Sequence, residues 1–192
     1  MNTANEFRRK AIGATFFTGF GAIWLGLSLY AQELLSTTTV TLVVVGTLSL
    51  LLGCLWTYRH ADLWPEVASD PAIGRTFNRV NAAQWIAGGL VAFSLARLHL
   101  DAYIPSAITA IVGIHLFPLA KLFRRKLHLV TGVAMVLWAS FTVLAVPVEH
   151  MQGITALGTG IILWASAAIS LLTGIASARS RNAAAADSSL TA

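Results

Sequence analysis

The sequence predicts an all-α, polytopic membrane bundle of six transmembrane helices with both termini in the cytoplasm. Two observations carry this prediction: 56% of the 192 residues are hydrophobic and only 11% are charged, and the apolar residues form long runs. A soluble domain carries roughly 25% charged residues, because its surface must be polar. The mean hydropathy of +0.72 therefore excludes a soluble globular enzyme, a disordered chain and a coiled coil.

Six apolar runs are long enough to cross a bilayer, since a helix needs about 20 residues to span 30 Å of hydrocarbon. Backbone polar groups cannot stay unpaired in lipid, so we expect each run to be a helix. The predicted spans are 11–31, 38–57, 80–98, 102–120, 127–148 and 153–178. The run 11–31 exceeds the apolar core of a signal peptide and is expected to stay uncleaved. The run 102–120 is the weakest, because it contains two prolines, a glycine and a histidine.

Lys and Arg residues fall almost entirely on one side of the predicted spans. Of 13 such residues, Arg97 alone lies on the other side. Cationic flanks stay in the cytoplasm during insertion, so both termini and the loop 58–79 are predicted to be cytoplasmic. The net charge of +5 thus reflects topology. Because the basic residues flank apolar runs, we expect the lipid bilayer, and no nucleic acid, as the partner.

The domain organisation follows from the spans. Residues 1–178 are predicted to form a single transmembrane domain. Residues 179–192 are small and polar, so we expect them to be a disordered cytoplasmic tail. The loop 58–79 is the only sizeable connection between predicted spans.

Small residues recur every four positions on three spans, which gives each helix a face that a neighbour can approach closely. We interpret these rows as interfaces within the chain, and a homo-oligomer interface is the alternative. The rows are Ala14-Thr18-Ala22-Gly26, Gln84-Gly88-Ala92-Ala96 and Ser166-Ser170-Gly174-Ala178.

The fifth and sixth spans share a short phrase. Residues 136–140 read VLWAS and residues 162–166 read ILWAS. Five residues of a vocabulary common in membrane helices are weak evidence for a duplicated unit. An internal repeat is therefore not the favoured interpretation.

A polar cluster is predicted near the cytoplasmic side. No Asp, Glu, Lys or Arg lies in the middle third of any span, which argues against ion-coupled transport through buried charges. Asn81 and Gln84 share one face of the third span, and His115 lies at a similar depth on the antiparallel fourth span, with Arg79 at the mouth. Two interpretations stay open: an interhelical hydrogen bond that fixes packing, or a pocket for a small ligand, lipid head group or ion.

Metal and catalytic sites have little support. Cys54 is the only cysteine, and the sequence contains no HxH, HExxH or CxxC spacing. We expect no metal, no cofactor and no catalytic residue, and hence no enzyme. A haem held by His115 and His128 at the inner edge is the alternative that the histidine positions leave open.

Three segments carry a resemblance: Phe77–Trp85, Ile111–Ala120 and Val130–Gly132. Together they resemble an uncharacterised family of small bacterial integral membrane proteins with VNxxQW and GxHxxPLA phrases on consecutive spans. The resemblance implies a location in the bacterial inner membrane and brings no activity with it. It points to four positions, which are Asn81, Gln84, His115 and Pro118.

Three functions are consistent with these patterns. The favoured one is a non-enzymatic module that binds a small ligand, lipid or protein partner at the polar cluster. The first alternative is a small permease or channel subunit, which needs a polar path lined by Ser and Thr faces of the first and sixth spans. The second is a haem- or metal-binding redox protein, which would show a Soret band or stoichiometric metal.

Overall fold

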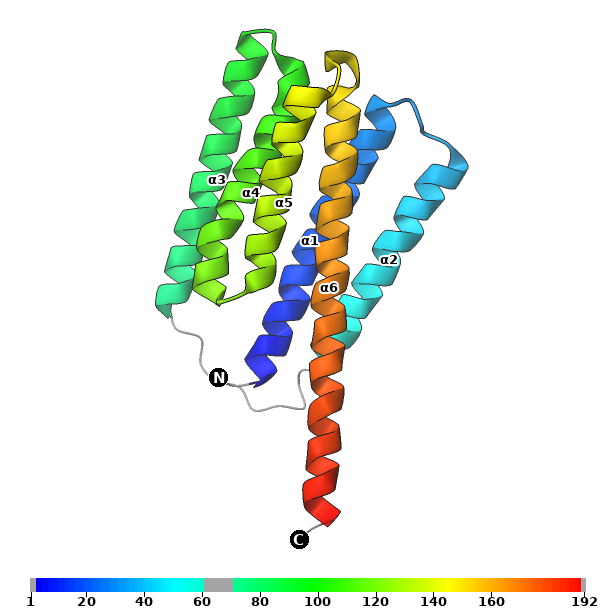
Figure 1. Ribbon diagram of the computed structural model, residues 1–192, viewed down its shortest axis with the longest axis vertical. Coiled ribbons are helices and arrows are strands. Elements are labelled where there is room, and N and C mark those ends of the chain that lie inside the picture. Colours follow the sequence, from blue (N-terminus) through cyan, green and yellow to red (C-terminus); the bar gives the residue numbers. More distant parts are fainter. Residues whose placement is uncertain (1–2, 61–70, 191–192) are drawn as a thin grey trace.

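The computed structural model describes residues 3–60 and 71–190, and almost all of them are helical (Figure 1). This part of the chain contains six long helices, one short 3-10 helix, η2 (Asp101–Tyr103), and no strand. The long helices are α1 (Thr3–Ala31), α2 (Thr37–His60), α3 (Pro71–Arg97), α4 (Ile104–Phe123), α5 (Lys126–Ala145) and α6 (Val148–Leu190). The prediction of an all-α helical bundle is confirmed.

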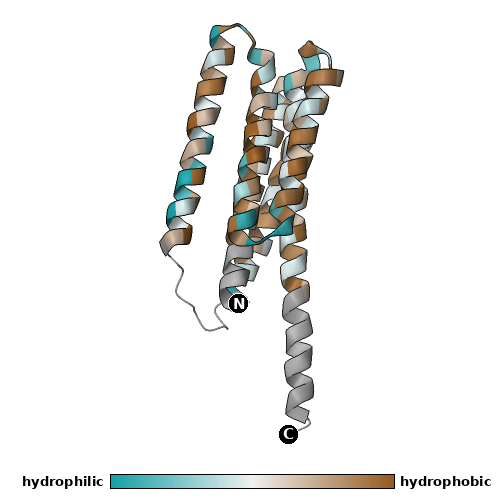
Figure 2. Cartoon of the chain, turned by 60° about the vertical axis from the view of Figure 1, so that its left-hand side comes forward, coloured by the Kyte–Doolittle hydropathy of each residue, from teal (hydrophilic) through white to brown (hydrophobic). Residues whose placement is uncertain are grey.

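Five helical segments are long and apolar enough to cross a membrane, as expected of a multi-pass membrane protein. Figure 2 shows hydrophobic residues along most of the length of the helices. The segment Asp101–Phe123 is among the five, so the predicted span 102–120, taken as the weakest, is apolar enough. Helix α3 is not among them, because Asn81, Gln84 and two adjacent glycines lower the hydropathy of the predicted span 80–98. The count of six crossings therefore stays a prediction.

Helices α1, α2 and α6 form one group of three, and helices α3, α4 and α5 form the other. Helices α1 and α2 pack with α6, while α3 packs on α4 and α4 packs on α5 (Figure 1). Helix α6 lies between the groups and contacts both α4 and α5. The outermost helices are α2 and α3, and the helices that share an interior are α1, α4, α5 and α6.

Tight turns join three pairs of helices. Each turn has a non-glycine residue in the left-handed region just beyond the helix end: Glu33 at φ 54°, His99 at φ 57° and Arg124 at φ 52°. The next amide bonds back to a carbonyl five residues earlier, which closes the helix end in the manner of a Schellman motif. These bonds are Leu34 to Leu29, Leu100 to Leu95 and Arg125 to Ala120, each 2.9 Å long.

Glycines let the central helices cross closely. A Cβ atom on Gly132 of α5 would lie 2.6 Å from the carbonyl oxygen of Gly113 on α4. Gly21 of α1 and Gly160 of α6 meet in the same way, with a Cβ on Gly160 lying 3.0 Å from the carbonyl oxygen of Gly21. Hence the backbones of α4 and α5, and those of α1 and α6, approach without a side chain between them.

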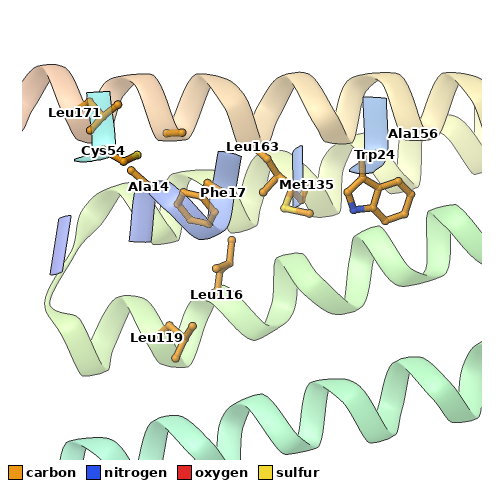
Figure 3. Packing of buried hydrophobic residues seen from close by; sticks show 11 residues of the cluster. Ala14, Phe17, Trp24, Cys54, Leu116, Leu119, Met135, Ala156, Leu163 and Leu171 are labelled. Atoms are coloured by element: carbon orange, nitrogen blue, oxygen red, sulfur yellow. The ribbon is translucent and has the colours of Figure 1, made fainter. Parts of the chain in front are cut away.

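The hydrophobic core lies between these crossings. Figure 3 shows side chains of α1, α4, α5 and α6 turned toward one another, among them Phe17, Leu116, Met135 and Leu163. Met135 is fully buried, although many other apolar side chains of its helix are exposed. The core is thus built from the four helices that share the interior.

Two small-residue rows lie within interfaces of the chain over part of their length. Ala14 and Thr18 of α1 are buried, and so are Ser166, Ser170 and Gly174 of α6. Helices α1 and α6 pack against each other along much of their length (Figure 1). Gly26, the last position of the α1 row, is exposed, and a Cβ there would meet no neighbour within 4 Å, so the interface prediction holds for the buried positions and is wrong for Gly26.

The shared phrase of the fifth and sixth spans has a structural counterpart. The indole of Trp138 on α5 donates a hydrogen bond to the carbonyl of Thr155 on α6 (3.1 Å) and covers Gly158. The indole of Trp164 on α6 donates to the carbonyl of Thr18 on α1 (3.2 Å) and covers Gly21. Each tryptophan thus contacts a Thr-x-x-Gly segment of a neighbouring helix.

Helix α6 continues beyond the predicted domain end. It runs to Leu190, whereas the sequence led us to expect a disordered tail at 179–192, and that expectation stays a prediction. Ala183–Ala186 have the highest helix propensity, which allows the helix to extend from the bundle. Within the predicted loop 58–79, residues 58–60 belong to α2 and residues 71–79 to α3, and residues 61–70 lie outside the described part of the chain.

Candidate functional site

A row of buried hydroxyl groups fills the contact of α6 with α4 and α5. The hydroxyl of Ser106 on α4 lies 3.1 Å from that of Thr142 and 2.9 Å from that of Thr155. Further along the bundle, Thr109 bonds to Thr159 (2.9 Å). Near the other end, Thr131 of α5 bonds to Ser166 of α6 (2.7 Å). We refer to these seven residues as the hydroxyl row.

The hydroxyl row is a packed interface. Thr109, Thr142, Thr155 and Thr159 are 0% exposed. The hydroxyls of Thr109 and Thr159 bond to each other, and those of Thr142 and Thr155 bond to Ser106. The permease alternative needs Ser and Thr residues of the sixth span to line a path. The α6 hydroxyls instead bond directly to α4 and α5, which leaves these groups no access to water.

His128 occupies a different environment at the start of α5. It is the third residue of the helix and only 8% exposed. Its ring lies between Phe17 of α1 and Phe123 of α4, with ring centroids 5.6 and 6.1 Å away. The Nδ1 atom of His128 is buried and has no hydrogen-bond partner. The imidazole is thus enclosed by aromatic rings with one nitrogen unsatisfied.

His115 of α4 repeats this feature. It is half-buried, and its Nδ1 atom is also buried without a hydrogen-bond partner. The ring interacts with the backbone of Val80 on α3 and lies close enough to His128 for an electrostatic interaction. Within the described residues, these two Nδ1 atoms are the only buried side-chain nitrogen or oxygen atoms left without a partner.

The other predicted cluster residues are on α3, the helix whose Val80 backbone His115 meets, and none of them bonds to His115. Asn81 directly follows Val80, and both Asn81 and Gln84 are half-buried, whereas Arg79 is exposed. Their side chains form no hydrogen bond within the described part of the chain. The structure thus brings the α3 and α4 segments together and shows no direct polar contact between Gln84 and His115. A binding role for this cluster stays a prediction.

His128 has a larger place in the site than the sequence indicates. The sequence names it only as a haem alternative, because a histidine three residues after Arg124-Arg125 is typical of a solvated helix end. Its burial comes from Phe17, more than 100 positions earlier in the chain. In the sequence, only the apolar neighbours Leu127, Leu129 and Val130 indicate that His128 belongs to an apolar segment.

The end of the bundle that holds both histidines is basic. We call it the basic end, and its described basic side chains are Arg59, Arg75, Arg79, Lys121, Arg124, Arg125 and Lys126. The three carboxylates whose side chains are described, Glu33, Asp101 and Glu149, belong to the turns at the opposite end (Figure 1). Among the described side chains, the potential around the imidazoles is therefore positive.

A shallow apolar hollow of about 310 Å³ lies on α1. Its lining comes from that helix alone, on the side turned away from the core, as Ile12, Thr15, Phe16, Gly19, Phe20 and Ile23. A surface of this kind, with no converging polar groups, is suited to contact with lipid chains. It offers no site for specific chemistry.

The described residues contain no group of three or more His, Cys, Asp or Glu side chains placed to hold a metal ion. Cys54 is buried and free. No protein-family model, no curated protein and no solved structure matches this chain.

Proposed function

We propose that this protein is a membrane module that binds a small ligand at the basic end, between α3, α4 and the start of α5. His115 and His128 would hold the ligand, with Asn81, Gln84 and Arg79 beside them. The observation that carries the proposal is the pair of buried Nδ1 atoms without partners, in a bundle whose buried hydroxyls are bonded.

The energetic argument is direct. A buried polar atom without a partner costs about 1–3 kcal/mol, because its bond to water is lost and not replaced. Two such atoms at one end of the molecule lower the stability of the ligand-free protein, and a ligand that bonds to both atoms removes this cost. Buried unsatisfied groups in native proteins often mark a ligand or catalytic site. Binding, with no covalent step, accounts for the arrangement.

The membrane setting is part of the proposal. The basic end faces the cytoplasm, since cationic flanks are retained on that side, and the membrane is the bacterial inner membrane that the resemblance implies. Helix α3 completes six crossings, because Asn81 and Gln84 are half-buried and its exposed residues include Trp85, Ile86, Leu90 and Phe93. The ligand site is then near the inner leaflet.

Native mass spectrometry of the protein taken in mild detergent from the membranes of the producing cells tests this proposal. We expect a bound mass on the wild-type chain. The variants His128→Leu and His115→Leu should lose it, because each removes an imidazole and keeps an apolar side chain. The variant His150→Leu is the matched control, since His150 is exposed at the opposite end.

The two outcomes are distinct. Loss of the bound mass in both imidazole variants and its retention in His150→Leu support the site. A wild-type protein without any bound mass, or a His128→Leu protein that keeps it, contradicts the proposal. Tryptophan fluorescence during thermal unfolding shows whether each variant is folded.

A further inference from the structure

The start of α5 is a helix N-terminus with no side-chain cap. Its N-cap residue, Arg125, has an extended backbone at φ −118° and ψ 113°, and its side chain makes no capping hydrogen bond. The first amides of a helix have no partner within the helix. The amides of Lys126, Leu127 and His128 therefore face the α4–α5 turn as donors, at the positive end of the helix dipole.

His128 supplies a second and independent observation. It lies in this same first turn, is 8% exposed, and has a buried Nδ1 atom without a partner. Arg125, the N-cap residue, precedes His128 by three positions, and its charge acts on the imidazole. The unsatisfied imidazole nitrogen and the uncapped amides thus belong to one turn of the chain.

The charges around this turn select the sign of the ligand. Lys121, Arg124, Arg125 and Lys126 belong to the end of α4, the turn and the start of α5, and the described carboxylates lie at the opposite end of the bundle. A metal cation would meet repulsion here and would lack a set of three ligands. An anion would meet amide, imidazole and guanidinium donors together, which are the groups that bind phosphate in proteins.

We infer that the ligand carries a phosphate group, and that this group binds at the first turn of α5 with His128 and Arg125. The inference rests on the proposed function and specifies its ligand class. A tetrahedral phosphate presents several acceptor oxygens at once, so it can satisfy the amides and both side chains. The phosphate belongs either to a phospholipid head group or to a soluble phosphate compound, and both share this chemistry.

Thermal unfolding of the full chain separates these sources. One series adds inorganic phosphate to protein in a neutral maltoside detergent, against sodium chloride of equal ionic strength. A second series places the protein in nanodiscs of phosphatidylglycerol, against nanodiscs of phosphatidylcholine. A ligand that binds the folded state raises Tm, and we expect a rise of roughly 3 °C or more near saturation.

Three variants define the site. Arg125→Gln and His128→Leu should raise the half-saturating phosphate concentration roughly tenfold, the effect of losing one charge-assisted hydrogen bond. Arg97→Gln is the matched control, because it removes the same charge from the opposite end of the bundle. We expect Arg97→Gln to respond as the wild type does.

Each result has a defined meaning. Stabilisation by inorganic phosphate identifies a site open to soluble phosphate compounds, and stabilisation by phosphatidylglycerol alone identifies a lipid head group. No stabilisation in either series, or an equal loss in Arg97→Gln and Arg125→Gln, overturns the inference. If that happens while native mass spectrometry still shows a bound mass that depends on His128, the proposed function stands with a ligand of another class.

Discussion

The hydroxyl row and the histidines of the basic end satisfy their polar atoms in different ways. The hydroxyls of Thr131 and Thr159 each bond to another helix and also to a carbonyl four residues earlier in their own helix. A hydroxyl on a short side chain always has this local alternative. The imidazole of His128 is rigid and planar, and it needs a partner from outside its helix.

The difference shows which unpaired groups are informative. A buried Ser or Thr in a membrane helix does not by itself indicate a ligand, because its own backbone can accept the bond. A buried imidazole nitrogen without a partner has no such alternative, so it indicates either a stability cost or an occupant. Four experiments test this comparison, in order of decreasing effect.

The largest effect is expected at Gly132, where α4 and α5 cross between the two regions. Gly132→Leu places a side chain against the carbonyl oxygen of Gly113 and the ring of Phe117. Separating the backbones should lower the free energy of unfolding by about 3 kcal/mol. Equilibrium unfolding in mixed SDS and maltoside micelles measures the loss.

Gly89→Leu is the control for this substitution, because a Cβ at Gly89 meets nothing within 4 Å. It should change stability by less than about 0.5 kcal/mol. Equal losses at Gly89 and Gly132 would show that helix propensity, and not the crossing, sets the effect.

His128→Leu should raise stability when no ligand is bound. The substitution removes a buried nitrogen without a partner and keeps an apolar side chain between Phe17 and Phe123. We expect a gain of about 1 kcal/mol in delipidated detergent without phosphate. The same SDS titration measures it, and a loss of stability there would show that the imidazole is satisfied by the protein itself.

Ser106→Ala should destabilise the bundle by about 0.6 kcal/mol, the average for side-chain hydrogen bonds between membrane helices. Ser106 is the only described hydroxyl that bonds to two other helices through side chains, Thr142 on α5 and Thr155 on α6. Ser140→Ala is the control, because Ser140 is exposed and bonds only to its own helix. If both serines give the same small change, the interhelical bonds add nothing to the local ones.

The smallest effect concerns the pair Gln84 and His115. Because no hydrogen bond joins them, Gln84→Ala and His115→Ala should be additive within about 0.5 kcal/mol in protein without ligand. A double-mutant cycle of unfolding free energies tests this. A coupling above 1 kcal/mol would mean that the two side chains touch directly.

The fold follows from the sequence to a large degree, because length and hydropathy alone require apolar runs to be helices. Helix α3 is the exception, since a helix whose polar residues turn toward a neighbour has a low mean hydropathy whatever its position. The hydroxyl row shows another limit. Spacing along α6 places Thr155 and Ser166 on a buried face, but it does not tell which helix supplies their partners.

The sequence predicts which helices meet near the candidate site, and it does not predict the surroundings of His128. Depth along the spans brings α3 and α4 together near His115, and the structure places His115 against the backbone of Val80. His128 is enclosed by Phe17 and Phe123, which come from α1 and α4. Contacts between helices distant in sequence leave no periodic pattern, so a single sequence does not indicate them.

The two tryptophans of the shared phrase determine how α6 can move. One indole reaches α6 from α5, and the other reaches from α6 to α1, each ending on a threonine carbonyl beside a glycine. A rotation of α6 about its long axis would break the hydrogen bonds of both indoles. Sliding of α5 along α6 therefore breaks the Trp138 contact, and sliding of α6 along α1 breaks the Trp164 contact.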